Sequence, residues 1–183
     1  MCEDQDMKIV GSFPESRKEN DSDGVVEEFT REKQSGVLDR AKELGCRMVE
    51  EFEKARGEFS FGADESEDAD LSLQRQILLA FVVTVGVERF CASSLASQTA
   101  RQSFFNSLKK YAPDLYRELN ETSAFSFYYL AYRRGGEVER RVGQTFAMLC
   151  ARDGDPVYQE LGEALYCWFI SVVKQKVQDM GLV

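Results

Sequence analysis

Histidine is missing from this 183-residue sequence, and its absence excludes several kinds of chemistry. The imidazole group is the commonest general base in enzymes and the commonest metal ligand in proteins. A Ser-His-Asp triad and a Cys-His pair therefore cannot be built from this chain alone. The Glu-x-x-His motif of di-iron helical bundles is excluded for the same reason.

Motifs for binding metals and phosphates are missing as well. The cysteines, at positions 2, 46, 91, 150 and 167, include no Cys-x-x-Cys pair, which disfavours a zinc or iron–sulfur site. Gly135-Gly136 is not followed by the Gly-Lys-Ser/Thr of a phosphate loop. The acidic run Asp64 to Asp70 does not fit an EF-hand, because Ala69 occupies the glycine position and Arg75 that of the bidentate glutamate. We therefore expect no cofactor, no metal and no enzymatic activity.

Long apolar runs are also missing. The longest, ILLAFVVTVGV from Ile77 to Val87, is too short for a helix to span a bilayer. The N-terminal MCEDQDMK lacks the basic segment and apolar run of a secretory signal. Cys91, Cys150 and Cys167 have apolar neighbours, which is typical of buried free thiols in a reducing compartment. We expect a cytoplasmic protein that does not contact membranes.

The net charge of −9 is concentrated in the first part of the chain. Residues 1–70 contain 21 acidic and 10 basic residues, whereas residues 71–183 contain 11 acidic and 13 basic ones. An acidic protein repels the phosphate backbone, so we expect no nucleic-acid partner. Residues 1–23 are mostly polar and predict a flexible acidic tail, in which only Met7 to Val10 (MKIV) could form a short strand.

Helical periodicity dominates the rest of the chain, which predicts a single helical domain over residues 24–183 with an acidic linker near 59–70. From Gly24 to Gly57 apolar residues recur at steps of three and four, with a break at Ser35-Gly36. Residues 70–92 are apolar on all sides in the middle, which indicates a central helix. The β-branched run Val82 to Val85 within it is equally compatible with a buried strand.

Helix boundaries are marked by proline, glycine and acidic residues. Pro113-Asp114 predicts a helix start. Gly154 predicts a helix end, followed by a new helix that Asp155 caps and Pro156 begins. We predict an all-α fold, a compact bundle of about six helices with a mobile acidic N-terminal tail. Its core helices would lie near residues 70–92, 123–134 and 156–180, with the helix near 36–57 outside.

The stretch AFSFYYLAYRRGGEVERR, from Ala124 to Arg141, combines aromatic and basic residues. On a helix its aromatic residues form one face, made of Phe125, Tyr128, Tyr129 and Tyr132. Phe127 and Leu130 take the other side, which implies neighbours on both sides of the helix. Gly135-Gly136 would end this helix and form a turn, and Glu137 and Arg141 would pair across the first turn of the next one. A structural role thus accounts for every residue of the stretch and is the favoured interpretation.

A binding role is the second interpretation of the same stretch. Buried phenol groups need polar partners, and tyrosine and arginine are enriched at interface hot spots. If the chain has a binding surface, we expect it here, formed by Tyr128, Tyr129, Tyr132, Arg133, Arg134, Arg140 and Arg141.

The composition and the missing motifs together predict a non-catalytic helical protein. Its expected role is protein–protein interaction or self-association, with a homodimer as one form. The alternative is a small-molecule-binding domain with an apolar, aromatic-lined pocket, in which tyrosine or arginine groups orient an anionic ligand.

Overall fold

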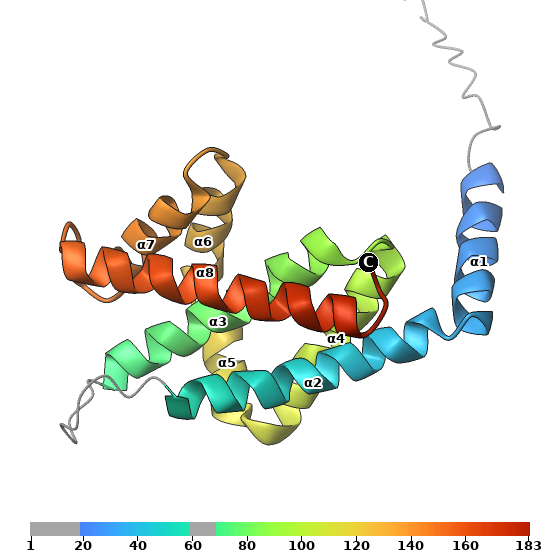
Figure 1. Cartoon of the computed structure of the whole chain (residues 1–183), viewed down its shortest axis with the longest axis horizontal. Coiled ribbons are helices and arrows are strands. Elements are labelled where there is room, and N and C mark those ends of the chain that lie inside the picture. Colours follow the sequence, from blue (N-terminus) through green and yellow to red (C-terminus); the bar gives the residue numbers. More distant parts are fainter. Residues whose placement is uncertain (1–18, 59–68) are drawn as a thin grey trace, which may run out of the picture. The chain divides into compact units, whose positions relative to one another are not determined.

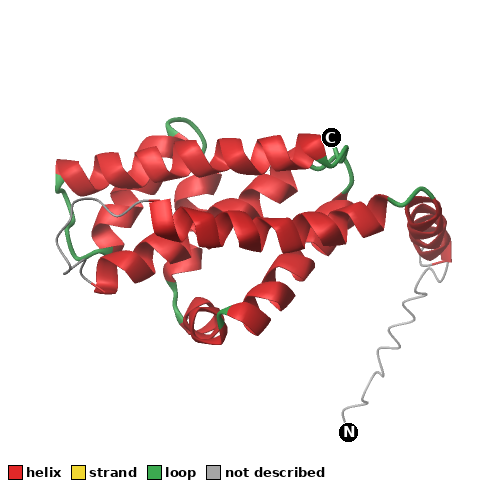
Figure 2. Ribbon diagram, turned by 60° about the horizontal axis from the view of Figure 1, so that its bottom comes forward, coloured by secondary structure: helices red, strands yellow, loops and turns green. Residues whose placement is uncertain are grey.

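The computed structural model of the chain describes residues 19–58 and 69–183, which are helical and contain no strand (Figures 1 and 2). The all-α prediction is therefore confirmed. The chain divides between Ser35 and Gly36 into two compact units, with α1 in the first and α2–α8 in the second. The helices of the described residues are α1 Glu19–Gln34, α2 Val37–Glu58, α3 Ala69–Phe90, α4 Ser94–Tyr111, α5 Pro113–Glu121, α6 Ala124–Arg133, α7 Val138–Leu149 and α8 Pro156–Asp179.

The described residues form eight helices, whereas the sequence predicted about six. Several of these helices are short and follow one another with few residues between them. Pro113 has no backbone N–H to donate, so α4 ends before it and α5 begins at it. Thr122 is extended, with φ −81° and ψ 144°, and separates α5 from α6.

The domain limits also differ from those that the sequence indicated. The predicted tail ended at residue 23 and the predicted domain began at 24, but α1 already begins at Glu19 and belongs to the N-terminal unit up to Ser35. The candidate strand Met7 to Val10 and most of the predicted linker, residues 59–68, lie outside the described residues.

Two helix starts are fixed by side-chain caps. The side chain of Ser93 accepts hydrogen bonds from the backbone N–H groups of Leu95 (3.1 Å) and Ala96 (3.2 Å) at the start of α4. At the start of α8, Asp155 accepts one from Val157 (2.9 Å), as the sequence predicted. These caps satisfy backbone donors that have no partner within the helix.

α3 is the central helix of the second unit and packs against each of α2, α4, α5, α6, α7 and α8 (Figure 1). All residues from Ile77 to Val87 are buried. The prediction of a central helix is confirmed, and Val82 to Val85 form part of it. Asp70–Phe90 is also long and apolar enough to cross a membrane, but 67% of its most apolar 18 residues are buried within the protein. Such burial is typical of a bundle's core helix.

Glycines allow the closest helix pairs to approach each other. A Cβ added at Gly45 in α2 would lie 2.4 Å from the carbonyl oxygen of Ala100 in α4. One added at Gly143 in α7 would lie 2.3 Å from the carbonyl oxygen of Gln159 in α8. Neither position has room for a side chain, since these backbones are already in contact.

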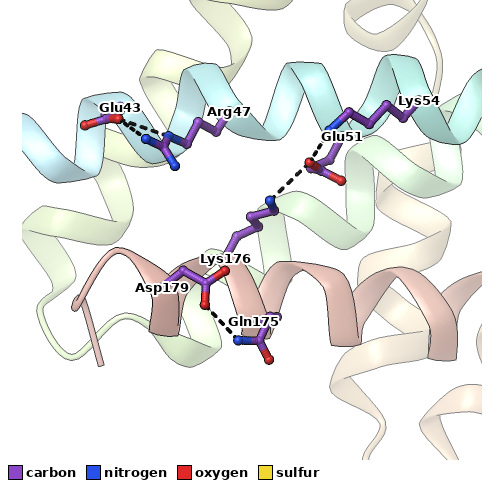
Figure 3. A network of polar contacts seen from close by, with 7 residues as sticks. All are labelled: Glu43, Arg47, Glu51, Lys54, Gln175, Lys176 and Asp179. Atoms are coloured by element: carbon purple, nitrogen blue, oxygen red, sulfur yellow. Dashed lines mark hydrogen bonds and ion pairs between the residues drawn. The ribbon is translucent and has the colours of Figure 1, made fainter.

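An ion-pair network joins α2 to α8 (Figure 3). The carboxylate of Glu51 accepts a hydrogen bond from Lys54 (2.9 Å) and pairs with Lys176 of α8 (3.1 Å). Burial alone would raise the pKa of Glu51, but the hydrogen bonds and charges of the two lysines outweigh it and lower that pKa. Glu51 is therefore an electrostatic link between the two helices.

Candidate binding surfaces around helix α6

The local sequence sets both ends of α6, the ten-residue helix of the aromatic stretch. The hydroxyl of Thr122 accepts a hydrogen bond from the backbone N–H of Ala124 (3.2 Å). Beyond the other end, Gly135 and Gly136 have φ values of 64° and 54°, which favour glycine. The predicted turn at Gly135-Gly136 is confirmed, and α7 returns from it to pack against α6.

One face of α6 packs on the ring of Phe81 in α3. Tyr128 stacks on this ring with centroids 5.2 Å apart and planes at 25°. Tyr129 meets it edge-on at 5.2 Å. Phe125 and Tyr132 also contact it edge-on, at 5.9 Å and 6.3 Å. The shared face predicted for these four aromatic residues of α6 is confirmed, and we call it the inner face.

Tyr128 is completely buried within this face. Its hydroxyl forms no hydrogen bond with any described residue. Burial, together with the nearby Cys150, raises the pKa of Tyr128 well above its usual value. Its ring therefore belongs to the core, and Tyr128 takes no part in the surface that we expected it to form.

The opposite face of α6 is open to solvent. Phe127 is 42% exposed and Leu130 is 57% exposed. Ser123, Phe127, Leu130 and Arg134 follow at steps of four, three and four, so they lie along one side of the helix, and all four are exposed. We call these four residues the outer stripe. The sequence predicted neighbours on this side too, but no described part of α2–α8 covers it.

The two arginines after the glycine turn interact with residues close to them in the sequence. Arg140 pairs with Glu137 at 3.4 Å, and Arg141 donates a hydrogen bond to the carbonyl oxygen of Gly136 at 3.4 Å. The predicted pair of Glu137 with Arg141 is thus replaced by a pair with Arg140. Arg140 and Arg141, which belong to the predicted binding set, therefore interact with residues at the turn before α7.

Tyr129, Tyr132 and Arg133 of the predicted set lie at a small cavity between α3 and α6, with a volume of about 210 Å³, whereas Arg134 belongs to the outer stripe. Arg133 lies over the ring of Tyr129, with 5.9 Å between the guanidinium carbon and the ring centroid. α3 contributes Glu88 and Arg89, both exposed, which were not among the residues of the predicted binding surface. We call this the Arg–Tyr cavity; its lining residues are Val85, Glu88, Arg89, Tyr129, Tyr132 and Arg133.

A larger groove, of about 1140 Å³, lies between α2 and α4. Most of its lining residues have polar or charged side chains, but the surface that they present to the groove is more apolar than polar. Within it the thiol of Cys46 lies 3.6 Å from the hydroxyl of Ser103 and 3.5 Å from that of Ser107. The sequence gave no signal for this groove, because its residues follow the ordinary pattern of a solvated helix face.

A third cavity, of about 450 Å³, comes nearest to the aromatic-lined pocket of the alternative prediction. It lies between α4, α5 and α6 and is lined in part by Phe105, Tyr116 and Phe125. Leu119 and three asparagine and glutamine side chains complete the lining, so amide groups interrupt its apolar surface.

The four cysteines within the described residues are free thiols. Cys91 and Cys150 are half-buried, whereas Cys46 and Cys167 are exposed, so the predicted burial of Cys167 is wrong. In α8 the apolar neighbours of Cys167 turn inward and leave the thiol outside. No three histidine, cysteine, aspartate or glutamate side chains of residues 19–58 and 69–183 are grouped to hold a metal ion.

No protein-family model matches this chain, and comparisons with curated proteins and with solved structures find no similar protein.

Proposed function

We propose that this protein is a self-association module in which α6 of one copy packs against α6 of a second copy. The observation that supports this proposal is the outer stripe. Among the described residues of α2–α8, this short helix buries only its inner face, and Phe127 and Leu130 remain exposed. Packing against a second copy would remove this apolar surface from water.

Charge favours an antiparallel arrangement of the two helices. Arg133 and Arg134 lie at the C-terminal end of α6, and the exposed Glu121 lies just before its N-terminal end. In a parallel pair the arginines of both copies would meet and repel each other. In an antiparallel pair Arg134 of each copy approaches Glu121 of the other. The two helix dipoles then point in opposite directions, which also favours this arrangement. This arrangement has the two-fold symmetry that most homodimers adopt.

The expected association is weak. A ten-residue helix is roughly 15 Å long, so two of them bury less than the roughly 1,200–2,000 Å² of a standard interface. We therefore expect a dimer that dissociates on dilution.

The test is sedimentation equilibrium over a wide concentration range. The wild-type mass should rise from 20.8 kDa towards twice that value. The double variant Phe127→Ser, Leu130→Ser should stay monomeric and folded. Val157→Ser is the matched control, because Val157 is an apolar residue 67% exposed on another helix, and it should associate like wild type.

A charge exchange tests the antiparallel arrangement separately. Glu121→Arg should weaken the dimer, as should Arg134→Glu, and the double variant should recover it. A wild-type protein that remains monomeric at millimolar concentration would refute self-association.

The groove between α2 and α4 supports a second candidate function, binding of a small molecule. Its volume of about 1140 Å³ is at the upper end of small-molecule pockets. Native mass spectrometry of freshly purified protein should then show an adduct of a few hundred daltons, roughly the mass of a ligand that fits such a pocket. Cys46→Trp, which fills the groove, should remove the adduct, whereas Cys167→Trp, at an exposed thiol on α8, should not.

A further inference from the structure

The Arg–Tyr cavity lies on the inner side of α6, against α3, and differs in chemistry from the outer stripe. Its volume of about 210 Å³ holds one small polyatomic ion but not a ligand of drug size. Five of its six lining residues end in polar or charged groups. A small cavity edged by such groups can select its ligand by charge and hydrogen bonding.

Its arginines have no carboxylate partner in the part of the chain that the structure describes. Arg47, Arg117 and Arg140 each pair with an acid three or four residues away on their own helix or its cap. Arg89 and Arg133, in contrast, form no ion pair with any carboxylate of residues 19–58 and 69–183.

Aromatic rings position these two guanidinium groups instead. Arg133 lies 5.9 Å from the ring centroid of Tyr129, and Arg89 lies 5.5 Å from that of Phe90. Stacking on a ring uses the flat face of a guanidinium group and leaves its N–H donors at the edge available. Both guanidinium groups thus lie near an aromatic ring, and no acid of the described residues uses their N–H donors.

Tyrosine hydroxyls supply further donors. Tyr129 and Tyr132 are half-buried and line the cavity. The buried hydroxyl of Tyr166, which forms no hydrogen bond with a described residue, interacts electrostatically with Tyr132 and Arg89. Burial raises the pKa of Tyr166 to about 12 and raises that of Tyr129 as well, so both phenols keep their protons at neutral pH.

The charge balance favours an anion. Glu88 is the only acid among the lining residues, and Arg89 and Arg133 oppose it. Arg101 of α4 acts on the Tyr129 hydroxyl from the other side. The carbonyl ends of α3 and α6 lie near the cavity and disfavour an anion, so binding must depend on the arginines.

We propose that Arg89, Arg133, Tyr129 and Tyr132 form a binding site for a small oxyanion, the phosphate or carboxylate group of a ligand. Arginine forms paired N–H···O hydrogen bonds with either group, and the phenols donate to the remaining oxygens. The site is independent of the proposed dimer, because it uses the opposite face of α6.

The test is thermal unfolding of the whole chain at constant ionic strength with inorganic phosphate, phenyl phosphate, acetate or chloride. At least one oxyanion should raise Tm by roughly 3–6 °C at ten times its Kd, whereas chloride should not. A response to phenyl phosphate alone would identify a phosphomonoester ligand, a response to phosphate the free ion, and a response to acetate a carboxylate.

Variants localise the effect. Arg89→Gln and Arg133→Gln should each weaken the apparent affinity for the oxyanion at least tenfold, which reduces the Tm shift. The Tm of each variant without ligand should stay near that of wild type. Arg117→Gln, at a paired arginine on α5, should respond like wild type. Equal responses in all three variants, or no response to any oxyanion up to 50 mM (roughly the weakest affinity of interest), would overturn the proposal. The result is read on monomer at low concentration, so failure of self-association does not affect it.

Discussion

The two faces of α6 carry similar residues but have opposite surroundings. On the inner face Tyr128 and three further aromatic side chains surround Phe81 of α3. On the outer face Phe127 and Leu130 are exposed. Residue type alone therefore does not decide burial in this helix. The inner face holds the unit together, and the outer face is the apolar surface available to a partner.

The largest effect should come from removing the ring on which the inner face is built. Phe81→Ala leaves a cavity that four aromatic side chains border, and should reduce the free energy of unfolding by about 3–5 kcal/mol. Urea denaturation measures this loss. Phe127→Ala, the same substitution on the outer face, should cost less than about 1 kcal/mol. Equal losses would show that the two faces do not differ as described.

A second substitution tests the support behind α6. α7 packs against α6 and is held closely to α8 at Gly143. Gly143→Ala places a methyl group 2.3 Å from the Gln159 carbonyl oxygen, so it should lower stability by about 1–3 kcal/mol. Gly24→Ala is the control, since its added Cβ would meet nothing within 4 Å, and it should be neutral or slightly stabilising. No loss in Gly143→Ala would mean that α7 and α8 separate easily.

A smaller effect, of opposite sign, is expected at Tyr128. Its buried hydroxyl has no described hydrogen-bond partner, and such a group costs about 1–3 kcal/mol of desolvation. Tyr128→Phe keeps the ring stacked on Phe81 and should leave stability unchanged or raise it by up to about 1 kcal/mol. Chemical denaturation measures the free energy of unfolding of the variant. A lower value than in wild type would show that the hydroxyl has a hydrogen-bond partner.

The smallest effect on stability is expected at Glu51, and it depends on pH. The pKa of Glu51 is lowered from 4.5, so its ion pairs stabilise the fold above pH 4.5, and this contribution is lost as pH falls through the lower folded pKa. Glu51→Gln should cost up to about 1 kcal/mol at pH 7 and progressively less below pH 4.5. Unfolding curves from pH 3 to 7 test this (roughly the interval in which carboxylates titrate), with Glu43→Gln, at the exposed pair with Arg47, as the control.

Most of the fold could be predicted from the sequence, because helical periodicity and end signals are local properties. The apolar run Ile77 to Val87 predicted a central helix, and Asp155-Pro156 predicted the start of α8. The number of helices could not be predicted as well. Thr122 separates α5 from α6 without a glycine or proline, so the sequence marks this boundary only weakly.

The candidate sites were only partly predictable. Periodicity placed Phe125, Tyr128, Tyr129 and Tyr132 on one face, but it could not show which face meets α3. Arg89 and Arg101 lie far from α6 in the sequence, so only the tertiary fold brings them to Tyr129. The groove between α2 and α4 likewise depends on the close approach at Gly45.

Photo-crosslinking from the outer stripe tests the central claim most directly. A benzoylphenylalanine placed at Leu130 of the purified protein should, on irradiation, give a product of twice 20.8 kDa whose linked peptide comes from α6 of the second copy. The same group at Val157 should give little of this product. Irradiation at high protein concentration that yields only monomer, or links to a helix other than α6, would contradict the account.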